Sequence, residues 1–456
     1  MHTRILLALG IGWALDSFEV QIIGSVIRPL AEEFGLLSAK GSVEPWALSA
    51  IWVVWFTGLM IGATSFGWLA DRFGRKRLFV ATLVVYSIAT VATAFAPNFA
   101  LFLIFRFVTA LGIGGEYSAV TSTIAEFMPT RRRGTATAAT MNFWSIGGIL
   151  SGLIGITFLN AFVKKEIVVG GLTLNAWRLC LLAGAIAAGY ALIARRIIPE
   201  SPRWLASQGR HEEARAIITD ITGIPDDGSD LVGRPNTRSL WAQMGELWSR
   251  WRGRLIYGMV LEFCATGAYY GLFTAFSAFV LVSGQVEVAA STVPFYYLVG
   301  NLGALVGGLA VASVIDRIGR KNTVLMAYGT ASISVLLLVL AATTKSPGLT
   351  MAAFTLCVFS ATCSWISAYT TFAELFPTEL RATGVGMSVG AGRIGGMLGV
   401  VGLSYIADGL GLVSAFSLLA VFFATGALAS LVWRSRGTEA RGLSLDEVSP
   451  PALSTS

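Results

Sequence analysis

The sequence predicts an all-α integral membrane protein with twelve transmembrane helices in two pseudo-symmetric six-helix bundles. The 456 residues are 55% hydrophobic and 13% charged, and the mean hydropathy is +0.70. A water-soluble chain of this length does not need so much apolar surface. A charged motif between apolar stretches also occurs twice, which indicates an internal duplication.

The duplication is visible in two pairs of motifs. Residues 67–77 read Gly-Trp-Leu-Ala-Asp-Arg-Phe-Gly-Arg-Lys-Arg, and residues 312–321 read Ala-Ser-Val-Ile-Asp-Arg-Ile-Gly-Arg-Lys. The second pair is Glu-Phe-Met-Pro-Thr-Arg-Arg-Arg-Gly at 126–134 and Glu-Leu-Phe-Pro-Thr-Glu-Leu-Arg-Ala at 374–382. Because both pairs have nearly the same offset, we infer that one membrane unit occurs twice. Many secondary transporters are built from such repeats around a central site.

Apolar runs of about 20 residues, the length that crosses the hydrocarbon core of a bilayer, occur twelve times. The first six lie near Ile5–Ile27, Ala47–Ala70, Leu78–Phe95, Ala100–Ala125, Thr135–Leu159 and Ala176–Ile198. The second six lie near Leu255–Val282, Ser291–Ile315, Thr323–Ala342, Leu349–Ala373, Ala382–Ala407 and Leu412–Trp433. We therefore expect a first bundle over 1–198, a cytoplasmic linker with short helices over 199–253, a second bundle over 254–434 and a mobile tail over 435–456.

The charged loops predict the orientation. Most Lys and Arg residues fall in segments 71–77, 126–133, 195–254, 316–321 and 374–381. Such basic loops remain in the cytoplasm, so both termini are expected there, with the protein in the plasma (inner) membrane. The net charge of +7 follows from this pattern and does not indicate nucleic acid.

The linker contains two helix-like patterns. The first runs over Pro202–Ile218. In the second, the apolar residues Leu240, Met244, Leu247, Trp248 and Trp251 recur at helical spacing beside arginines. This pattern predicts an amphipathic helix at the cytoplasmic membrane surface.

Two carboxyl groups lie in the first apolar run. Asp16 is about 11 residues from its start, roughly 16 Å deep at the helical rise, and Glu19 follows at i+3 on the same face. Two acids this close cannot both ionise cheaply at low dielectric, so one is expected to hold a proton. We expect Asp16 and Glu19 to carry the coupling proton, with hydrogen bonding to a neighbouring helix as the alternative. Glu116 in the fourth run is a third candidate, for which an ion pair between helices is the alternative.

Arg393 lies roughly 14 Å into the eleventh run. A guanidinium at this depth stays charged and needs an anion. The anion is either a substrate carboxylate bound by two hydrogen bonds or an internal carboxylate that holds the halves together. Other side chains within the spans are candidates to line the pathway and to stack on or hydrogen-bond a ring substrate, with core packing as the alternative. They are Asn142, Trp144, Glu262, Tyr269, Tyr270, Asn301 and Trp365.

The repeated motifs resemble the signature of the major facilitator superfamily. Residues 106–116, the string Pro-Glu-Ser-Pro-Arg-Trp-Leu at 199–205 and residues 438–447 are similar to the sugar-porter branch and its organic-ion relatives. Residues 261–270 lack the Gln-Gln pair with which that branch binds hexose hydroxyls. The acids at Asp16 and Glu19 and the stretch 392–396 are instead similar to proton symporters for aromatic acids and to nicotinate-type carriers.

The resemblance implies that the duplicated motifs form a cytoplasmic gate. Glycines permit tight turns and close helix packing, and opposite charges at the helix ends form a network that closes the inner side. A solvated basic loop is the alternative, but it does not explain the repeated acidic residues. The expected gate residues are Gly67, Asp71, Arg72, Gly74, Arg75, Glu126, Arg133, Glu200, Arg203, Asp316, Arg317, Gly319, Arg320, Glu374 and Arg381.

The sequence gives no support for an enzyme, a cofactor or a metal site. Its two histidines join no nucleophile, and a Walker loop is missing, so transport energy is expected from an ion or substrate gradient. We expect a secondary active symporter for protons and a small organic carboxylate, with aromatic acids first among the candidates. Sugar or polyol transport, organic-cation transport on the same acids and a non-transporting sensor are the alternatives. The expected partners are the substrate, protons and the lipid bilayer, without nucleic acid. We expect the protein to be a monomer.

Overall fold

The computed structural model describes residues 2–38, 43–127, 133–161, 167–169, 172–222, 239–276, 292–377 and 380–439. Within these ranges, ten helices are long and apolar enough to cross a membrane, and the shorter apolar segments Phe99–Gly115 and Ala176–Ala185 bring the number to the expected twelve. A chain in lipid favours helices because every backbone N–H and C=O must find its hydrogen bond inside the protein.

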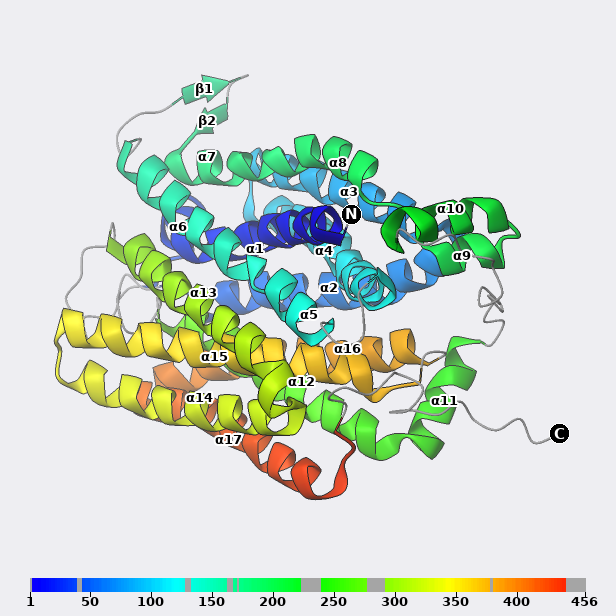
Figure 1. Ribbon diagram of the computed structural model, residues 1–456. Coiled ribbons are helices and arrows are strands. Elements are labelled where there is room, and N and C mark those ends of the chain that lie inside the picture. Colours follow the sequence, from blue (N-terminus) through cyan, green and yellow to red (C-terminus); the bar gives the residue numbers. More distant parts are fainter. Residues whose placement is uncertain are drawn as a thin grey trace.

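The first half of the bundle consists of the elements up to α8 and occupies the upper part of Figure 1. A small antiparallel hairpin, β1 and β2, lies at its outer end, with Val168 opposite Thr173. The elements are α1 (His2–Glu33), α2 (Pro45–Phe73), α3 (Arg75–Ala94), α4 (Phe99–Phe127), α5 (Arg133–Met141), α6 (Phe143–Ala161), β1 (Ile167–Val169), β2 (Leu172–Leu174), α7 (Ala176–Leu182), η2 (Ala183–Ala185) and α8 (Ile186–Ile197).

The second half begins at α12 and occupies the lower part of Figure 1. Three short helices precede it, α9 (Pro202–Ser207), α10 (His211–Thr222) and α11 (Leu240–Arg250). Its elements are α12 (Arg252–Ala275), α13 (Val293–Ile318), α14 (Arg320–Thr343), α15 (Pro347–Leu375), α16 (Arg381–Leu410) and α17 (Leu412–Arg436).

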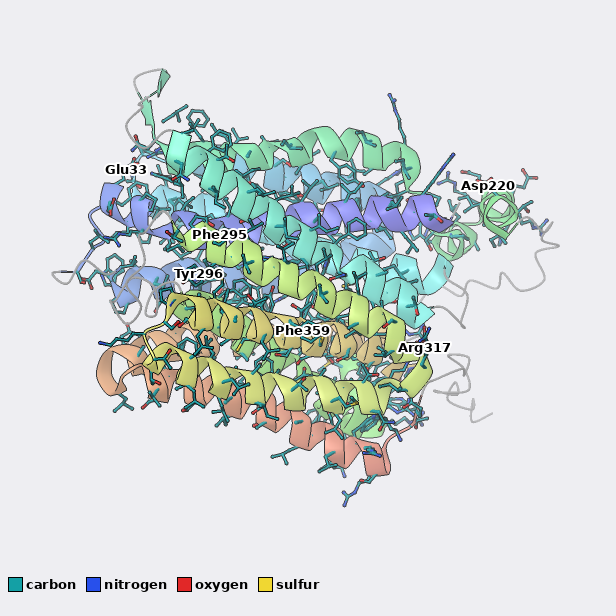
Figure 2. All side chains as sticks on the ribbon, turned by 60° about the vertical axis from the view of Figure 1, so that its left-hand side comes forward. Glu33, Asp220, Phe295, Tyr296, Arg317 and Phe359 are labelled. Atoms are coloured by element: carbon teal, nitrogen blue, oxygen red, sulfur yellow. The ribbon has the colours of Figure 1, made fainter. Side chains whose placement is uncertain are left out.

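The two halves meet along two seams. α13 packs against α5 and α6, and α16 packs against α2. The N-terminus and α9 to α11 lie at one end of the helices, and the β hairpin lies at the other (Figure 1). Figure 2 places Arg317 at the first of these ends and Glu33 at the second. We call the end with the N-terminus and Arg317 the basic end and the other the hairpin end.

One predicted helix is divided in the structure, and two predicted spans contain an interruption. The expected helix over Pro202–Ile218 is two helices, because Gly209 adopts a φ of 75° and Arg210 N–H bonds back to Leu205 O, which ends α9. The fifth span is interrupted at Asn142, and the sixth by the 3₁₀ turn η2. The described part of the seventh span ends at Phe276; its predicted end at Val282 and tail residues 440–456 lie outside the described residues.

The duplicated turn before a charged helix has the same structure in both halves. Gly74 precedes α3 with φ 94°, and Gly319 precedes α14 with φ 88°, a left-handed backbone that glycine adopts without strain. The Glu200 carboxylate accepts a hydrogen bond from Lys76 N at 3.2 Å, and the Glu439 carboxylate accepts one from Arg320 N at 2.9 Å. Each carboxylate therefore caps the positive end of a helix dipole. The sequence predicted Gly74, Gly319 and Glu200 in these turns but missed Glu439.

Candidate functional site

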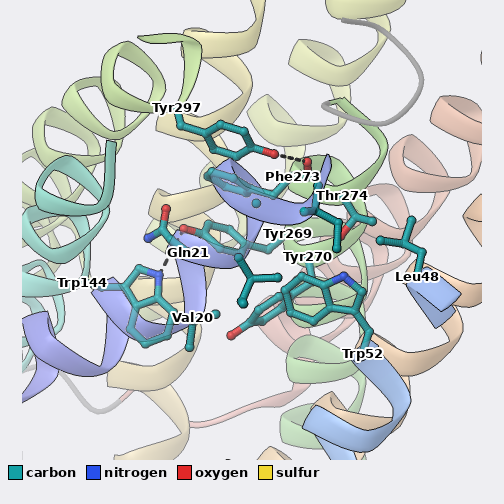
Figure 3. A pocket seen from close by; sticks show the side chains of 13 residues that line it. Val20, Gln21, Leu48, Trp52, Trp144, Tyr269, Tyr270, Phe273, Thr274 and Tyr297 are labelled. Carbon is teal, nitrogen blue, oxygen red and sulfur yellow. Dashed lines mark hydrogen bonds between the residues drawn. The ribbon is translucent and has the colours of Figure 1, made fainter. Parts of the chain in front are cut away.

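A cavity lies between the two halves (Figure 3), with about 480 Å³ of empty space that includes space open to solvent. We call it the aromatic cavity because rings from both halves form much of its wall. Among the described residues on that wall, Gln21 and Thr274 are the polar side chains that carry no ring. The ring-bearing lining residues are Trp52, Trp144, Tyr269, Tyr270, Phe273 and Tyr297.

A second, smaller cavity adjoins the first, because Trp144, Tyr269 and Tyr270 line both. Thr266, Trp365 and Arg393 complete its lining. We call it the arginine cavity. Trp144 Nε1 donates a hydrogen bond to the Tyr269 hydroxyl at 3.2 Å. This bond joins a residue of the first half to one of the second, and both residues line both cavities.

Arg393 on α16 and Glu262 on α12 lie on two helices that pack together. Both side chains are buried, with exposed fractions of 2% and 0%, and the positive charge of Arg393 acts electrostatically on the Glu262 carboxylate. Thr266 Oγ1 donates to Glu262 Oε1 at 2.9 Å. Glu262 belongs to the same half as Arg393, so it is not the carboxylate that would hold the two halves together. Substrate binding by Arg393 stays a prediction.

The helices α12 and α16 approach closely because glycines of α16 face α12. A Cβ added at Gly392 would lie 2.4 Å from Glu262 Cγ. A Cβ added at Gly395 would lie 2.3 Å from Phe263 O. Small residues allow this contact between membrane helices, and it brings the turns that carry Arg393 and Glu262 together.

Glu19 on α1 pairs with Arg106 on α4. Glu19 Oε1 and Arg106 Nη1 are 2.5 Å apart, with side chains only 1% and 2% exposed. The guanidinium carbon of Arg106 also lies 4.1 Å from the Trp55 ring centroid, a cation–π contact. Asp16, one turn earlier on α1, is 0% exposed. The described linings of the two cavities contain neither acid, and the side chain of Glu116 lies outside the described residues.

Asn142 and Asn301 lie at the seam between the halves and do not belong to either cavity lining. Asn142 Nδ2 donates to Leu305 O on α13 at 3.0 Å. Asn301 Nδ2 donates to Gln21 Oε1 on α1 at 2.8 Å. Gln21 was not among the predicted site residues, although a carboxamide within a membrane span is itself a signal of function.

An aromatic layer crosses the seam beside the arginine cavity. Trp365 of α15 stacks on Trp13 of α1 at 6.2 Å between ring centroids, and its ring is tilted against that of Trp144 of α6 at 5.6 Å. Trp365 and Trp144 were predicted site residues, whereas Trp13 was not. Offset stacking of this kind adds to the contact between the halves.

The described part of the predicted gate forms a network at the basic end. Arg320 contacts both oxygens of Glu374, at 2.8 and 3.1 Å, and Asp316 at 2.7 Å. Asp316 Oδ2 also accepts hydrogen bonds from the N–H and hydroxyl of Thr135 on α5, at 2.9 and 2.7 Å, so the network crosses from the second half to the first. Arg381 donates to Phe376 O at 3.4 Å.

Arg317 is exposed, outside this network. For the other predicted gate residues, the structure describes at most the backbone, so their expected contacts lie outside the described residues. They are Gly67, Asp71, Arg72, Arg75, Glu126, Arg133 and Arg203.

An ionic cluster at the hairpin end was not predicted. Arg178 of α7 pairs with Glu33 of α1 at 2.5 Å and donates to the carbonyls of Ala94 and Ala96 at 2.7 and 2.9 Å. Trp177 Nε1 also donates to Glu33 at 2.6 Å. This cluster fastens α1, α3 and α7 together. Neither charge belongs to a repeated motif, so the sequence carried no signal for it.

A family model described as sugar (and other) transporter matches residues 6–450. The chain belongs to that family, within the major facilitator superfamily. Its members are transporters, so the prediction of a transporter rather than an enzyme is confirmed, as is the twelve-helix fold.

Two relatives are niacin carriers by name. The chain is 30% identical over 400 residues to the niacin transporter NiaP of Acinetobacter baylyi, covering 87% of this chain and 85% of that protein. It is 29% identical over 399 residues to the putative niacin/nicotinamide transporter NiaP of Bacillus subtilis, with 87% and 86% covered.

Among solved structures, the proton:xylose symporter XylE bound to 6-bromo-6-deoxy-D-glucose superimposes with a TM-score of 0.79. The match covers 98% of each chain at 19% sequence identity, which establishes a common fold.

Proposed function

We propose that this protein is a proton symporter that imports a small aromatic carboxylate, with nicotinate as the first candidate. The observation that carries the proposal is Arg393, a buried cation on the wall of a cavity whose other walls are largely aromatic. A guanidinium binds a carboxylate with two parallel hydrogen bonds, and the rings of Trp144, Tyr269 and Tyr270 offer faces and edges to an aromatic ring. The names of the two niacin carriers support this choice.

Transport would proceed by alternating access, in which the two halves rock about the central site. The network of Asp316, Arg320 and Glu374 would close the basic end, together with the predicted gate residues whose side chains are not described. By the positive-inside rule, the basic end faces the cytoplasm of a cell whose plasma (inner) membrane holds the protein.

The coupling proton would use the buried acids of α1. Asp16 is fully buried, and Glu19 forms an ion pair with Arg106 at 2.5 Å. Protonation of a buried acid changes its pairing and thereby the relative stability of the two states of a carrier. Glu116 remains a third candidate, because it is a carboxyl group within the fourth membrane span.

The test is nicotinate uptake by the purified protein in proteoliposomes. With an inward proton gradient, the wild type should accumulate labelled nicotinate, and a protonophore should abolish the accumulation. Arg393→Ala should lose at least tenfold in uptake because a buried charged hydrogen bond is worth about 1.5–3 kcal/mol. The control is Arg252→Ala, which removes an exposed arginine at the start of α12. Equal uptake by both variants would contradict the anion site.

Sugar or polyol transport is a second candidate, because the family model and the fold of XylE favour it. Against it, a sugar would leave several hydroxyl groups without partners on walls this rich in rings, and each unpaired group costs about 1–3 kcal/mol. Xylose, glucose and an aliphatic polyol should therefore fail to compete with labelled nicotinate. Competition by a sugar together with uptake that survives Arg393→Ala would favour the sugar reading. Loss of cation uptake in Asp16→Asn would instead favour organic-cation transport.

A further inference from the structure

Gln21 is a polar residue of the aromatic cavity to which the transport scheme above gives no role. It lies on α1, and its side chain is 8% exposed and lines the cavity (Figure 3). Among the described residues on that wall, Thr274 is the other polar side chain without a ring. A carboxamide carries two N–H donors and one oxygen that accepts up to two hydrogen bonds. The bonds that Gln21 makes can therefore be counted.

The neighbours of Gln21 fix the orientation of its carboxamide. Asn301 Nδ2 donates to Tyr297 O at 2.9 Å and to Gln21 Oε1 at 2.8 Å, so the oxygen of Gln21 faces Asn301. On its other side, Gln21 Nε2 donates to Ser17 Oγ at 2.8 Å. Ser17 Oγ in turn gives its own proton to Trp144 O at 2.5 Å. A flipped carboxamide would bring two N–H groups face to face at Asn301, so the network admits one orientation.

This count leaves one N–H of Gln21 without an acceptor in the described part of the chain. The first of its two N–H groups bonds to Ser17. The nearby Asn301 Oδ1 accepts a hydrogen bond from no described group, so it does not take the second. A buried donor without an acceptor is costly. A cavity wall that keeps such a donor is therefore suited to a ligand that brings the acceptor.

We propose that Gln21 donates this N–H to a nitrogen in the ring of the substrate and thereby selects pyridine carboxylates over benzene carboxylates. The inference deepens the proposed function and rests on the substrate being an aromatic carboxylate, with Arg393 as the partner of the carboxylate group.

The chemistry of the cavity favours a ring nitrogen as the acceptor. A pyridine nitrogen accepts a hydrogen bond in the plane of its ring, so both ring faces stay available to the aromatic walls. It replaces a C–H group and adds no atom to the ring, so nicotinate and benzoate have nearly the same shape. Benzoate would leave the N–H of Gln21 buried and unpaired, which is how a site with a committed donor rejects an analogue without the acceptor.

The position of Gln21 suits a substrate that Arg393 holds by its carboxylate. Arg393 lines the arginine cavity and Gln21 the aromatic cavity, and the two cavities share the walls formed by Trp144, Tyr269 and Tyr270. Gln21 is linked to one of these walls by the hydrogen bonds through Ser17 to Trp144 O. The carboxylate would thus lie in the arginine cavity and the ring against the wall that carries Gln21.

Titration calorimetry of nicotinate and benzoate with the purified full-length protein at neutral pH tests this. At this pH both acids are carboxylates, and the ring nitrogen of nicotinate carries no proton. The wild type should bind nicotinate about tenfold more tightly than benzoate, the effect of one hydrogen bond to an otherwise unpaired buried donor. Gln21→Leu should remove this preference. The control is Ser25→Ala, which removes a buried hydroxyl one turn further along α1 and outside both described cavity linings, and it should keep the preference.

The ratio of the two Kd values distinguishes recognition from a purely structural role. Gln21→Leu also deprives Asn301 of an acceptor, and a structural disturbance would weaken the binding of both acids alike. Loss of the ring-nitrogen contact instead weakens nicotinate alone. Arg393→Ala makes the complementary change, because it should weaken both acids while the ratio of their Kd values stays near that of the wild type.

The outcomes separate this inference from the carboxylate proposal. If the wild type binds neither acid, the carboxylate proposal fails and this inference fails with it. If the wild type binds both acids equally, or if Gln21→Leu keeps the preference for nicotinate, the inference is overturned while the carboxylate proposal stands. Should Gln21→Leu not fold, Gln21→Met, which has a side chain of similar length without an N–H, must remove the preference. A preference retained in Gln21→Met would overturn the inference as well.

Discussion

At the scale of single residues, two pairs of buried opposite charges in the described part of the chain join different helices, Glu19 with Arg106 and Arg320 with Glu374. Glu19 and Arg106 are 2.5 Å apart across α1 and α4, and both are buried. Such a pair loses hydration on both sides, so its members depend on each other far more than exposed pairs do. The pair Arg28 and Glu32 on α1 is a natural contrast, because its side chains are 39% and 53% exposed.

We predict that Glu19→Gln lowers the thermal stability of the purified protein strongly. The change leaves Arg106 without its carboxylate in a buried position, which costs about 3–5 kcal/mol. Glu32→Gln, the matched control on the same helix, should cost about 1 kcal/mol or less. Thermal unfolding in detergent measures both. The double variant Glu19→Gln with Arg106→Gln should recover part of the loss, and a double variant that shows the plain sum of the single effects would contradict the coupling.

At the scale of elements, the contact between α12 and α16 positions the arginine cavity. A Cβ added at Gly395 or Gly399 of α16 would lie 2.3 Å from a backbone oxygen of α12, and backbone cannot move aside as a side chain can. The pattern of glycines four apart was readable in the sequence, but the face to which they point was not.

Gly395→Ala should therefore separate α12 from α16 and weaken nicotinate uptake. Overpacking of this kind costs about 1–3 kcal/mol, and it would move Arg393 away from Glu262 as well. Gly402→Ala is the control on the same helix, because a Cβ there meets no atom within 4 Å. It should keep wild-type uptake and stability. Initial rates in proteoliposomes and melting temperatures would show the difference; equal behaviour of the two variants would argue against the close contact.

The elements also show what a single sequence predicts well. The amphipathic pattern at 240–251 predicted α11 to within a residue, and Leu247 of the apolar stripe is fully buried. The expected position of α11 on a membrane surface remains a prediction. The helix expected over Pro202–Ile218 failed because the periodicity continues through Gly209, whose backbone conformation ends α9. Local patterns thus predict helices but miss the turns within them.

Contacts between helices were harder to predict than the helices. The depth of Glu19 in its span indicated that it needs a partner, but not that this partner is Arg106. Gln21 on the cavity wall and Glu439 in the second turn were missed for the same reason. Partners depend on how each helix is rotated about its axis, and one sequence without relatives does not contain that rotation.

At the scale of the whole molecule, the halves are joined at more than one level. Asn301 bonds to Gln21 near the aromatic cavity, and Asp316 bonds to Thr135 at the basic end. The second contact joins α13 to the N-terminus of α5, where a carboxylate is favoured by the helix dipole. A carrier that opens at the basic end must break this contact, so it contributes to the free-energy difference between the closed and open states.

Removing the Asp316 carboxylate should therefore shift the protein toward opening at the basic end. Asp316→Ala abolishes two hydrogen bonds to Thr135, while Arg320 keeps both of its contacts with Glu374. At about 1.5–3 kcal/mol for a hydrogen bond to a charged group, the open population should rise about tenfold or more.

A cysteine placed at Ala312, whose carbonyl accepts from Thr135, would report the change through its rate of labelling by an impermeant maleimide applied from the basic end. The four native cysteines are buried and leave little background. Ser313→Ala, whose exposed hydroxyl bonds within its own helix, should leave the rate unchanged. Equal labelling of Ala312→Cys with and without Asp316→Ala would mean that this contact does not hold the halves closed.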